Sequence, residues 1–184
     1  MIESYARHRR SIRLPGYDYA QVGWYFVTIC TWGKANLFGE VLDKEIHLNG
    51  IGRIVKECWD DLPSHFPGVI SDELMVMPDH IHGIVEIPDN RRGTACRAPT
   101  TGGERFGHPV AGSLATIVRS FKSAATKSIN QLRWTPGIPV WQRNYYEHII
   151  RDEKAVNRIR QYILDNPAKW DEDPENPDGL KSNT

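Results

Sequence analysis

The feature that most constrains the fold is a pair of β-rich segments joined by a very short turn. Residues 69–80 (VISDELMVMPDH) and 80–88 (HIHGIVEIP) are rich in apolar and β-branched side chains, which favour strands. The turn Met77–Pro78–Asp79 lies between them. A connection this short joins antiparallel neighbours, because parallel strands need a long crossover. We therefore predict an antiparallel sheet that contains this hairpin.

The remaining elements follow from hydrophobic periodicity and capping residues. Strands are predicted at 24–32, 36–48 and 139–151, and helices at 50–62, 114–132 and 152–170. Asn49, Ser113 and Asp152 are the expected helix N-caps, Pro63 the expected end of the first helix, and Asn166–Pro167 the end of the last. The order ββαββαβα predicts an α+β fold, with the helices packed on one face of the sheet.

The length of 184 residues predicts a single domain over residues 1–170. We expect a basic N-terminal arm at 1–16 and a flexible loop at about 89–112, which is rich in Gly, Pro, Thr and Arg. Residues 171–184 form an acidic tail that we expect to be disordered.

The composition argues against export and membrane insertion. No apolar run approaches the roughly 20 residues that span a bilayer, and the N-terminus lacks the apolar stretch of a signal peptide. Cys30, Cys58 and Cys96 include no CxxC pair, and an odd number of cysteines leaves one over in any disulfide scheme. We therefore expect reduced thiols in the cytoplasm and no membrane partner.

A net charge of zero conceals a strong segregation of charge. Residues 105–146 contain no acidic residue, whereas the acids gather in the C-terminal WDEDPENPD. Such basic stretches can bind polyanions, although solvated surface residues also cluster by chance. The cationic residues of interest are Arg7, Arg9, Arg10 and Arg13 in the arm, and Arg119, Lys122 and Lys127 in the middle helix.

The clearest chemical signal is His80-Ile81-His82. Residues two apart in a strand point to the same side, so both imidazoles face one spot. They suit a metal ion, and they also suit two half-buried structural histidines. A catalytic metal would need a further ligand from elsewhere in the chain. Tyr162 and Asn166 share one face of the last helix, where a core tyrosine and a C-cap would also fit.

Five segments in combination resemble the REP-associated tyrosine transposases, a branch of the single-tyrosine HUH transposases. They are LPGYDYAQVGWYFVTICTWGK, VMPDHIHGIVEI, IVRSFKSAATKSIN, VWQRNYYEHIIRDE and IRQYILDNPAKW, in this order, over roughly residues 7–170. The resemblance implies the ferredoxin-like, RRM-like HUH endonuclease fold. The loop at 89–112 and the acidic tail are outside the resemblance.

The resemblance also implies the roles of the site residues. His80, His82 and Asn166 would bind Mg²⁺ or Mn²⁺, and Tyr162 would be the nucleophile that forms a 5′-phosphotyrosine. Asn166 is shorter than the glutamine of some relatives. Tyr145 and Tyr146 are competing nucleophiles without a polar partner one helical turn away, and His148 is a candidate general base by residue type alone.

The implied activity is cleavage and strand transfer of single-stranded DNA at palindromic, REP-like hairpins. The linkage energy is kept in the covalent intermediate, so no nucleotide cofactor is expected. The basic residues above would contact phosphates, with Tyr17 and Tyr19 available for stacking. Either a monomer or a homodimer is compatible with the resemblance.

The alternative function is that of a host-adopted protein that binds hairpins without cutting them. Metal phosphoesterases fit poorly, because Ile84 stands where a histidine-triad hydrolase needs its third histidine.

Overall fold

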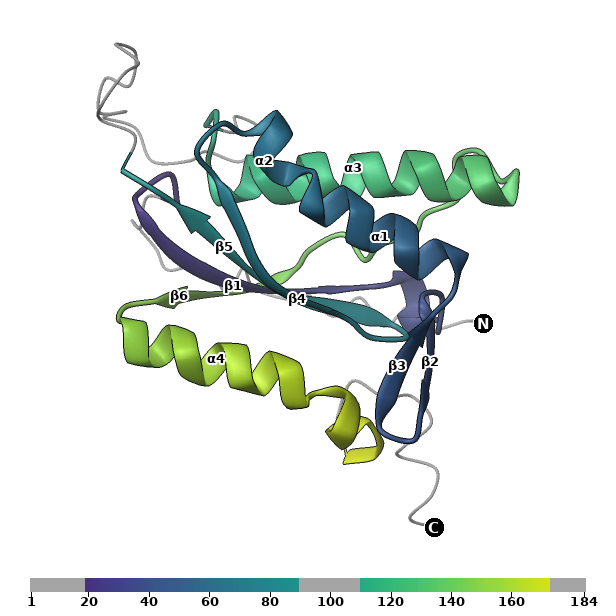
Figure 1. Cartoon of the computed structure of the whole chain (residues 1–184). Helices are drawn as coiled ribbons and strands as arrows, with labels where there is room; N and C mark the ends of the chain where they lie inside the picture. The colour runs from purple at the N-terminus through teal and green to yellow at the C-terminus, as the bar shows by residue number, and fades with distance from the viewer. Residues whose placement is uncertain (1–18, 90–109, 173–184) are drawn as a thin grey trace, which may run out of the picture.

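The computed structural model describes residues 19–89 and 110–172. The basic arm, most of the 89–112 loop and nearly all of the acidic tail lie outside the described residues. A four-stranded antiparallel sheet forms the centre, in the order β4-β5-β1-β6 (Figure 1). Its strands are β1 (Gly23–Cys30), β4 (Ile70–Val76), β5 (His80–Ile87) and β6 (Tyr146–Ile150). The helices are α1 (Gly50–Asp60), α2 (Leu62–His65), α3 (Leu114–Arg133) and α4 (Glu153–Asp165).

The hairpin predicted from the short turn is confirmed. β4 and β5 pair antiparallel, and the amide of Met77 donates a hydrogen bond to the carbonyl of His80 across the turn. β5 also pairs with β1 along its whole length, from Gly23 opposite Ile87 to Cys30 opposite His80. The two central strands are thus the ones that contain the aromatic segment and the two histidines.

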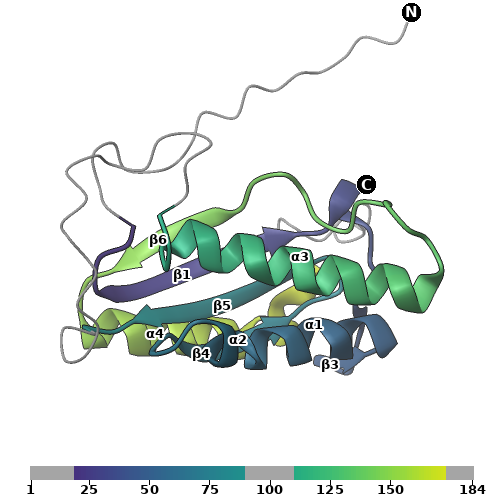
Figure 2. The same ribbon diagram turned by 90° about the horizontal axis from the view of Figure 1, so that it is seen from above.

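The two faces of the sheet are covered by different helices. Tyr25, Val27 and Ile29 of β1 point into the larger core, which α1 and α3 close. Phe26 and Ile84 point the other way, into a smaller cluster with Val156 and Ile163 of α4. Figure 1 shows α4 on the opposite side of the sheet from α1, α2 and α3, and Figure 2 shows α1 and α3 side by side over the sheet. The prediction that all helices pack on one face was wrong. The last helix alone covers the other face.

Three predicted segments have different boundaries in the structure. Residues 36–48 form a hairpin of two strands, β2 (Gly39–Leu42) and β3 (Glu45–Leu48), in a separate sheet. Pro63 does not end helical structure, because it lies in the first turn of α2, where its missing N–H costs nothing. Of 139–151, only β6 is a strand of the sheet, and Trp141 makes an isolated bridge to Thr31.

The predicted N-caps are confirmed. Asn49 accepts hydrogen bonds from the amides of Ile51 and Gly52, and Ser113 and Asp152 cap α3 and α4 in the same way. Asn166 ends α4, and a 3₁₀ helix, η2 (Pro167–Glu172), follows it. Another short 3₁₀ segment, η1 (Trp32–Lys34), follows β1. In the described part of the chain, no disulfide joins Cys30 and Cys58, and no helix is long and apolar enough to cross a membrane.

Gly83 allows α1 to pack closely on the sheet. A Cβ atom at this position would overlap the indole ring of Trp59, which is fully buried on α1. Gly83 follows His82 in β5 and points to the opposite face. The close approach of Trp59 therefore leaves the histidine face untouched.

We expect Gly83→Ala to lower the free energy of unfolding by about 1–3 kcal/mol, because overpacked cores must shift their neighbours. Urea denaturation measures the loss. Gly50→Ala is the matched control, since its nearest neighbour is a terminal carbon of Leu132 at 3.7 Å, and it should be neutral or slightly stabilising. Equal stability of the two variants would contradict this packing.

Candidate active site

His80 and His82 converge on one point beneath the sheet. Both are buried, and their Nε2 atoms are 3.0 Å apart. The alternation of β5 sends both rings to the face that α4 covers, while Ile81 points into the main core. The predicted shared orientation of the two imidazoles is therefore confirmed.

Each imidazole is held at its other nitrogen. Nδ1 of His80 is 2.6 Å from Oδ1 of Asp79, and Nδ1 of His82 is 2.9 Å from the hydroxyl of Thr28. Thr28 lies directly opposite His82 in the β1–β5 register. A contact at Nδ1 directs the Nε2 atoms of the two rings toward each other, within hydrogen-bond distance, and histidine ligands of metals are usually held in this way at their second nitrogen.

The protein keeps His82 neutral. Burial lowers the pKa of this imidazole well below its ordinary value of 6.5, and the charges of His80 and Lys34 act in the same direction. Metal ligation requires a neutral imidazole. The electrostatics of the site therefore favour the form of His82 that binds a metal.

Asn166 brings a buried amide to the same region. The side chain is only 4% exposed, and its Oδ1 atom has no hydrogen-bond partner. One turn before it, the ring of Tyr162 lies 5.4 Å from that of His82. Four residues after it, the ring of Trp170 lies 6.0 Å from that of His80. Contacts with the histidine pair thus flank Asn166 on both sides.

The geometry of the two histidines fits a divalent cation. Two ligands at right angles, each about 2.1 Å from a Mg²⁺ ion, are about 3.0 Å apart, which matches the Nε2 separation. A buried amide oxygen without a partner is the kind of atom that a cation would satisfy. No three His, Cys, Asp or Glu side chains in the described segments could hold a metal together. The amide of Asn166 is therefore the candidate for a third protein ligand.

Two tyrosines approach the site from different elements. Tyr162 of α4 is 46% exposed and contacts the rings of both His82 and Phe26. Tyr146, the first residue of β6, is similarly exposed, and its ring centroid lies 6.3 Å from that of Phe26. Tyr145 packs against the main core instead. Of the three, Tyr162 is the one with a ring contact to a histidine of the pair.

His148 is available on the same face of the sheet. It pairs with Phe26 in the β1–β6 register and is exposed. Paired residues in antiparallel strands share a face. The imidazole is thus on the side of the sheet where Tyr162 and Tyr146 lie.

The cations of α3 lie across the sheet from the histidine pair. Arg119 and Lys127 are exposed there. Lys122 donates hydrogen bonds to the carbonyls of Gln142 at 2.6 Å and Asn144 at 3.2 Å, and burial lowers its pKa to about 8. Its amine ties α3 to the segment that leads into β6. A role of these residues in DNA binding stays a prediction, and the four arginines of the N-terminal arm lie outside the described residues.

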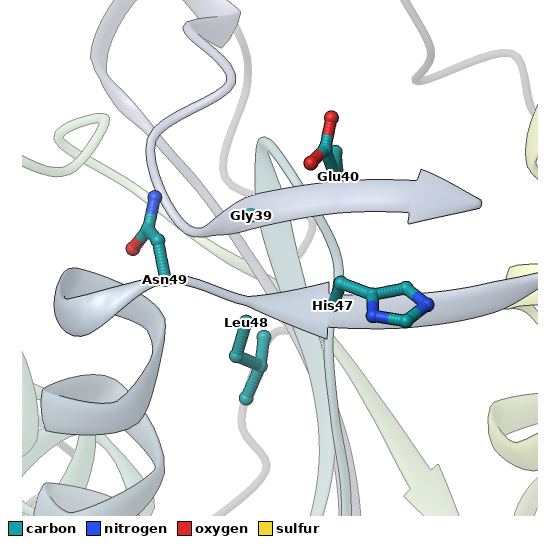
Figure 3. A pocket seen from close by; sticks show the side chains of 5 residues that line it. All are labelled: Gly39, Glu40, His47, Leu48 and Asn49. Carbon is teal, nitrogen blue, oxygen red and sulfur yellow. The ribbon is translucent and has the colours of Figure 1, made fainter.

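A surface pocket of about 410 Å³ lies away from the histidines, where the β2–β3 hairpin meets the start of α1 (Figure 3). Its lining consists of Gly39, Glu40, His47, Leu48 and Asn49. The side chains of Glu40 and His47 are exposed, and Asn49 is the N-cap of α1. This hollow is a feature of the hairpin junction and shares no residue with the histidine site.

The sequence patterns do not reveal the residues that hold the imidazoles or support them. The sequence predicts Asp79 only as part of the turn, although its position next to His80 is a signal that a carboxylate could meet Nδ1. Thr28 could not be found without the register of β1 on β5. Lys34, whose Nζ lies 3.7 Å from Asp79, is distant in sequence and gives no local signal.

The lowered pKa of His82 predicts how stability depends on pH. Below about pH 6.5 the unfolded chain binds a proton at His82 that the folded protein does not. The contribution of neutral His82 to the free energy of unfolding is therefore fully present above this pH, and the stability falls as the pH is lowered below it. One such proton changes the free energy of unfolding by up to about 1.4 kcal/mol per pH unit. Urea denaturation between about pH 7.5 and 5.5 should therefore show a shallower dependence for His82→Gln than for the wild type. His47→Gln, at an exposed histidine, is the control, and parallel curves for all three proteins would contradict the account.

The comparisons with known proteins concern the sequence and the fold of the chain. No protein-family model matches the chain. An uncharacterized protein of Haemophilus influenzae is 41% identical over 90% of this chain and 92% of its own length. A second protein of that organism, named "Putative REP-associated tyrosine transposase", is 24% identical over 83% of this chain and 74% of its own length.

Among solved structures, a REP-associated tyrosine transposase bound to a REP hairpin shares the fold. Its TM-score is 0.52 at 19% identity, over 81% of this chain and 68% of that one. The chain thus belongs to the same family as the first Haemophilus protein and has the fold of a REP-associated tyrosine transposase, as its motifs predicted.

Proposed function

We propose that this protein is a metal-dependent endonuclease and strand transferase of single-stranded DNA, acting at palindromic hairpins through a 5′-phosphotyrosine. One observation carries the proposal: β5 and α4 together supply three features that this chemistry needs. These are the paired Nε2 atoms, the unbonded amide oxygen of Asn166 and the half-exposed ring of Tyr162 against His82. One relative is named a putative REP-associated tyrosine transposase, and a REP-associated tyrosine transposase of similar fold was solved with a REP hairpin.

His80, His82 and Asn166 would hold the cation. A divalent ion there would draw charge from a nonbridging oxygen of the scissile phosphate and orient its phosphorus. Imidazole and amide ligands suit Mn²⁺ well and Mg²⁺ adequately. Neutral His82 needs to lose no proton before it binds, because burial already lowers its pKa.

Tyr162 would act as the nucleophile. Its phenolic oxygen attacks the phosphorus, the bond from phosphorus to the 3′ oxygen breaks, and the departing strand takes up a proton to become a free 3′-OH. The phenolic proton passes to a base, for which His148 is the candidate on the same face. A 3′-OH from the same or another strand later attacks the phosphotyrosine and restores the tyrosine, so the linkage energy is conserved.

The location of Tyr162 suits this role. It is on an exposed part of α4, so a flexible single strand can reach it, whereas the histidines beneath are buried. The exposed cations Arg119 and Lys127, on the opposite face of the sheet, would bind phosphates of the hairpin distant from the cleaved one, without reading sequence. Lys122 is the weakest of the three for this purpose, because its amine already serves two carbonyls.

The direct test is a covalent adduct. Labelled single-stranded hairpins made from inverted repeats that flank the gene are incubated with the protein and Mn²⁺ or Mg²⁺, and the products are separated on a denaturing protein gel. We expect a metal-dependent adduct with the wild type and none with Tyr162→Phe or His80→Ala, because the first lacks the nucleophile and the second a ligand. Tyr146→Phe is the matched control and should retain the adduct.

Two outcomes would change the proposal. An adduct lost in Tyr146→Phe and kept in Tyr162→Phe would move the nucleophile to β6. Tight hairpin binding without an adduct under either metal would favour the second candidate, a hairpin-binding protein that does not cut. The intact set of His80, His82, Tyr162 and Asn166 favours the enzyme.

A further inference from the structure

Asp79 is a carboxylate buried completely beside the histidine pair. Its Oδ1 atom lies 2.6 Å from Nδ1 of His80, the short distance typical of a charge-assisted hydrogen bond. An ionised carboxylate can only accept hydrogen bonds. The proton of a neutral His80 is therefore held on Nδ1, and Nε2 keeps its lone pair toward His82.

The backbone fixes the position of this carboxylate. The carbonyl of Asp79 accepts a hydrogen bond of 2.8 Å from the amide of Thr31. The preceding carbonyl, of Pro78, accepts two more, from the amides of Leu37 and Phe38 at 2.8 and 3.0 Å. The turn between β4 and β5 is thus tied to the chain that leaves β1, and Asp79 has little freedom to move away from His80.

Lys34 supplies a positive charge to the same carboxylate. Its Nζ atom lies 3.7 Å from Oδ2 of Asp79. Lys34 follows Gly33 in η1, and both adopt positive φ angles, of 58° and 66°. This conformation is uncommon for lysine, and such backbone strain tends to be kept where a function needs it. A buried carboxylate is costly unless it is paired, so Lys34 lowers the cost of keeping Asp79 charged.

We propose that Asp79 is a positioning residue that holds His80 with Nε2 directed at the cation, and that Lys34 supports it by balancing its charge. The inference rests on the metal centre of the proposed function and adds two residues that do not touch the metal. His82 has only the neutral hydroxyl of Thr28 at its own Nδ1. The partner of His80 is thus a carboxylate and the partner of His82 is a neutral hydroxyl, so the metal affinity depends more on Asp79 than on Thr28.

The test measures the tautomer of His80 and the affinity for Mn²⁺ in the full-length protein. Nitrogen-15 NMR of the imidazole rings in the metal-free protein reports which nitrogen carries the proton, and calorimetric titration with Mn²⁺ alone gives the affinity. Asp79→Ala should shift protonation toward Nε2 of His80 and weaken Mn²⁺ binding by about 10- to 100-fold, the usual effect of losing a partner of a metal-bound histidine. Thr28→Val should weaken it less.

Further variants separate positioning from folding. Asp79→Asn keeps the shape and loses the charge, and should still weaken Mn²⁺ binding by roughly tenfold. If Asp79→Ala does not fold, the Mn²⁺ affinity of Asp79→Asn tests the proposal in its place. Asp60→Asn makes the same chemical change on exposed α1, where Asp60 pairs with Lys56, and should bind Mn²⁺ like the wild type. Lys34→Met should weaken binding in the wild-type background and add little to Asp79→Asn, because the charge it balances is then absent.

Two results would overturn the inference. One is a folded Asp79→Ala in which His80 keeps its proton on Nδ1. The other is an Mn²⁺ affinity of Asp79→Asn within about twofold of that of the wild type, where a loss of roughly tenfold is expected. The tautomer measurement needs neither metal nor DNA. A wild-type protein that binds Mn²⁺ but forms no adduct would therefore refute the nuclease activity and leave the role of Asp79 standing.

Discussion

The pairing of β5 with β1 is the interaction on which the site depends. It places His82 opposite Thr28, and the alternation of β5 then sends both imidazoles to the face that α4 covers. A shift of register by one residue would reverse every side chain of the strand and turn the histidines into the main core. The close packing of Gly83 on Trp59 opposes such a shift, because no other residue of β5 could take that position without a clash.

The two faces of the sheet serve different purposes. The α1 and α3 face holds the large apolar core, which supplies most of the burial. The α4 face has a small apolar cluster, and the rest of it is given to polar groups that are costly to bury. The unbonded oxygen of Asn166 and the carboxylate of Asp79 are both of this kind. Proteins accept such costs mainly where a function needs them.

The sequence predicted those parts of the structure that local patterns determine. Caps, the short β4–β5 turn and the shared side of His80 and His82 all follow from spacing within one segment. The β2–β3 hairpin was missed, since Asp43 and Lys44 adopt positive φ angles in its turn where Asn-Gly is the usual signal. The face chosen by α4 could not be predicted either, because helical periodicity shows which side of a helix is apolar and not which side of a sheet it meets.

The residues of the candidate site also fall into a group that was predicted from the sequence and a group that was not. The histidines, Tyr162 and Asn166 are predicted site residues because the resemblance supplies roles for residues that periodicity alone would assign to a core or a cap. Asp79 of the turn and Thr28 of β1 contact the imidazoles, and Lys34 of η1 contacts Asp79. Two of these contacts join residues far apart in the chain, so only the folded structure brings them to light.

The central claim, that α4 and β5 together form a metal centre, is tested most directly by the stability of Asn166→Ala with and without Mn²⁺. A buried polar atom without a partner costs about 1–3 kcal/mol, so we expect the metal-free variant to unfold at the same temperature as the wild type or a higher one. Mn²⁺ should stabilise the wild type by mass action and the variant much less. Asn157→Ala, on the exposed side of α4, should respond to Mn²⁺ like the wild type. A variant that is less stable without metal, yet gains as much from Mn²⁺ as the wild type, would show that Asn166 only caps the helix and would contradict the account.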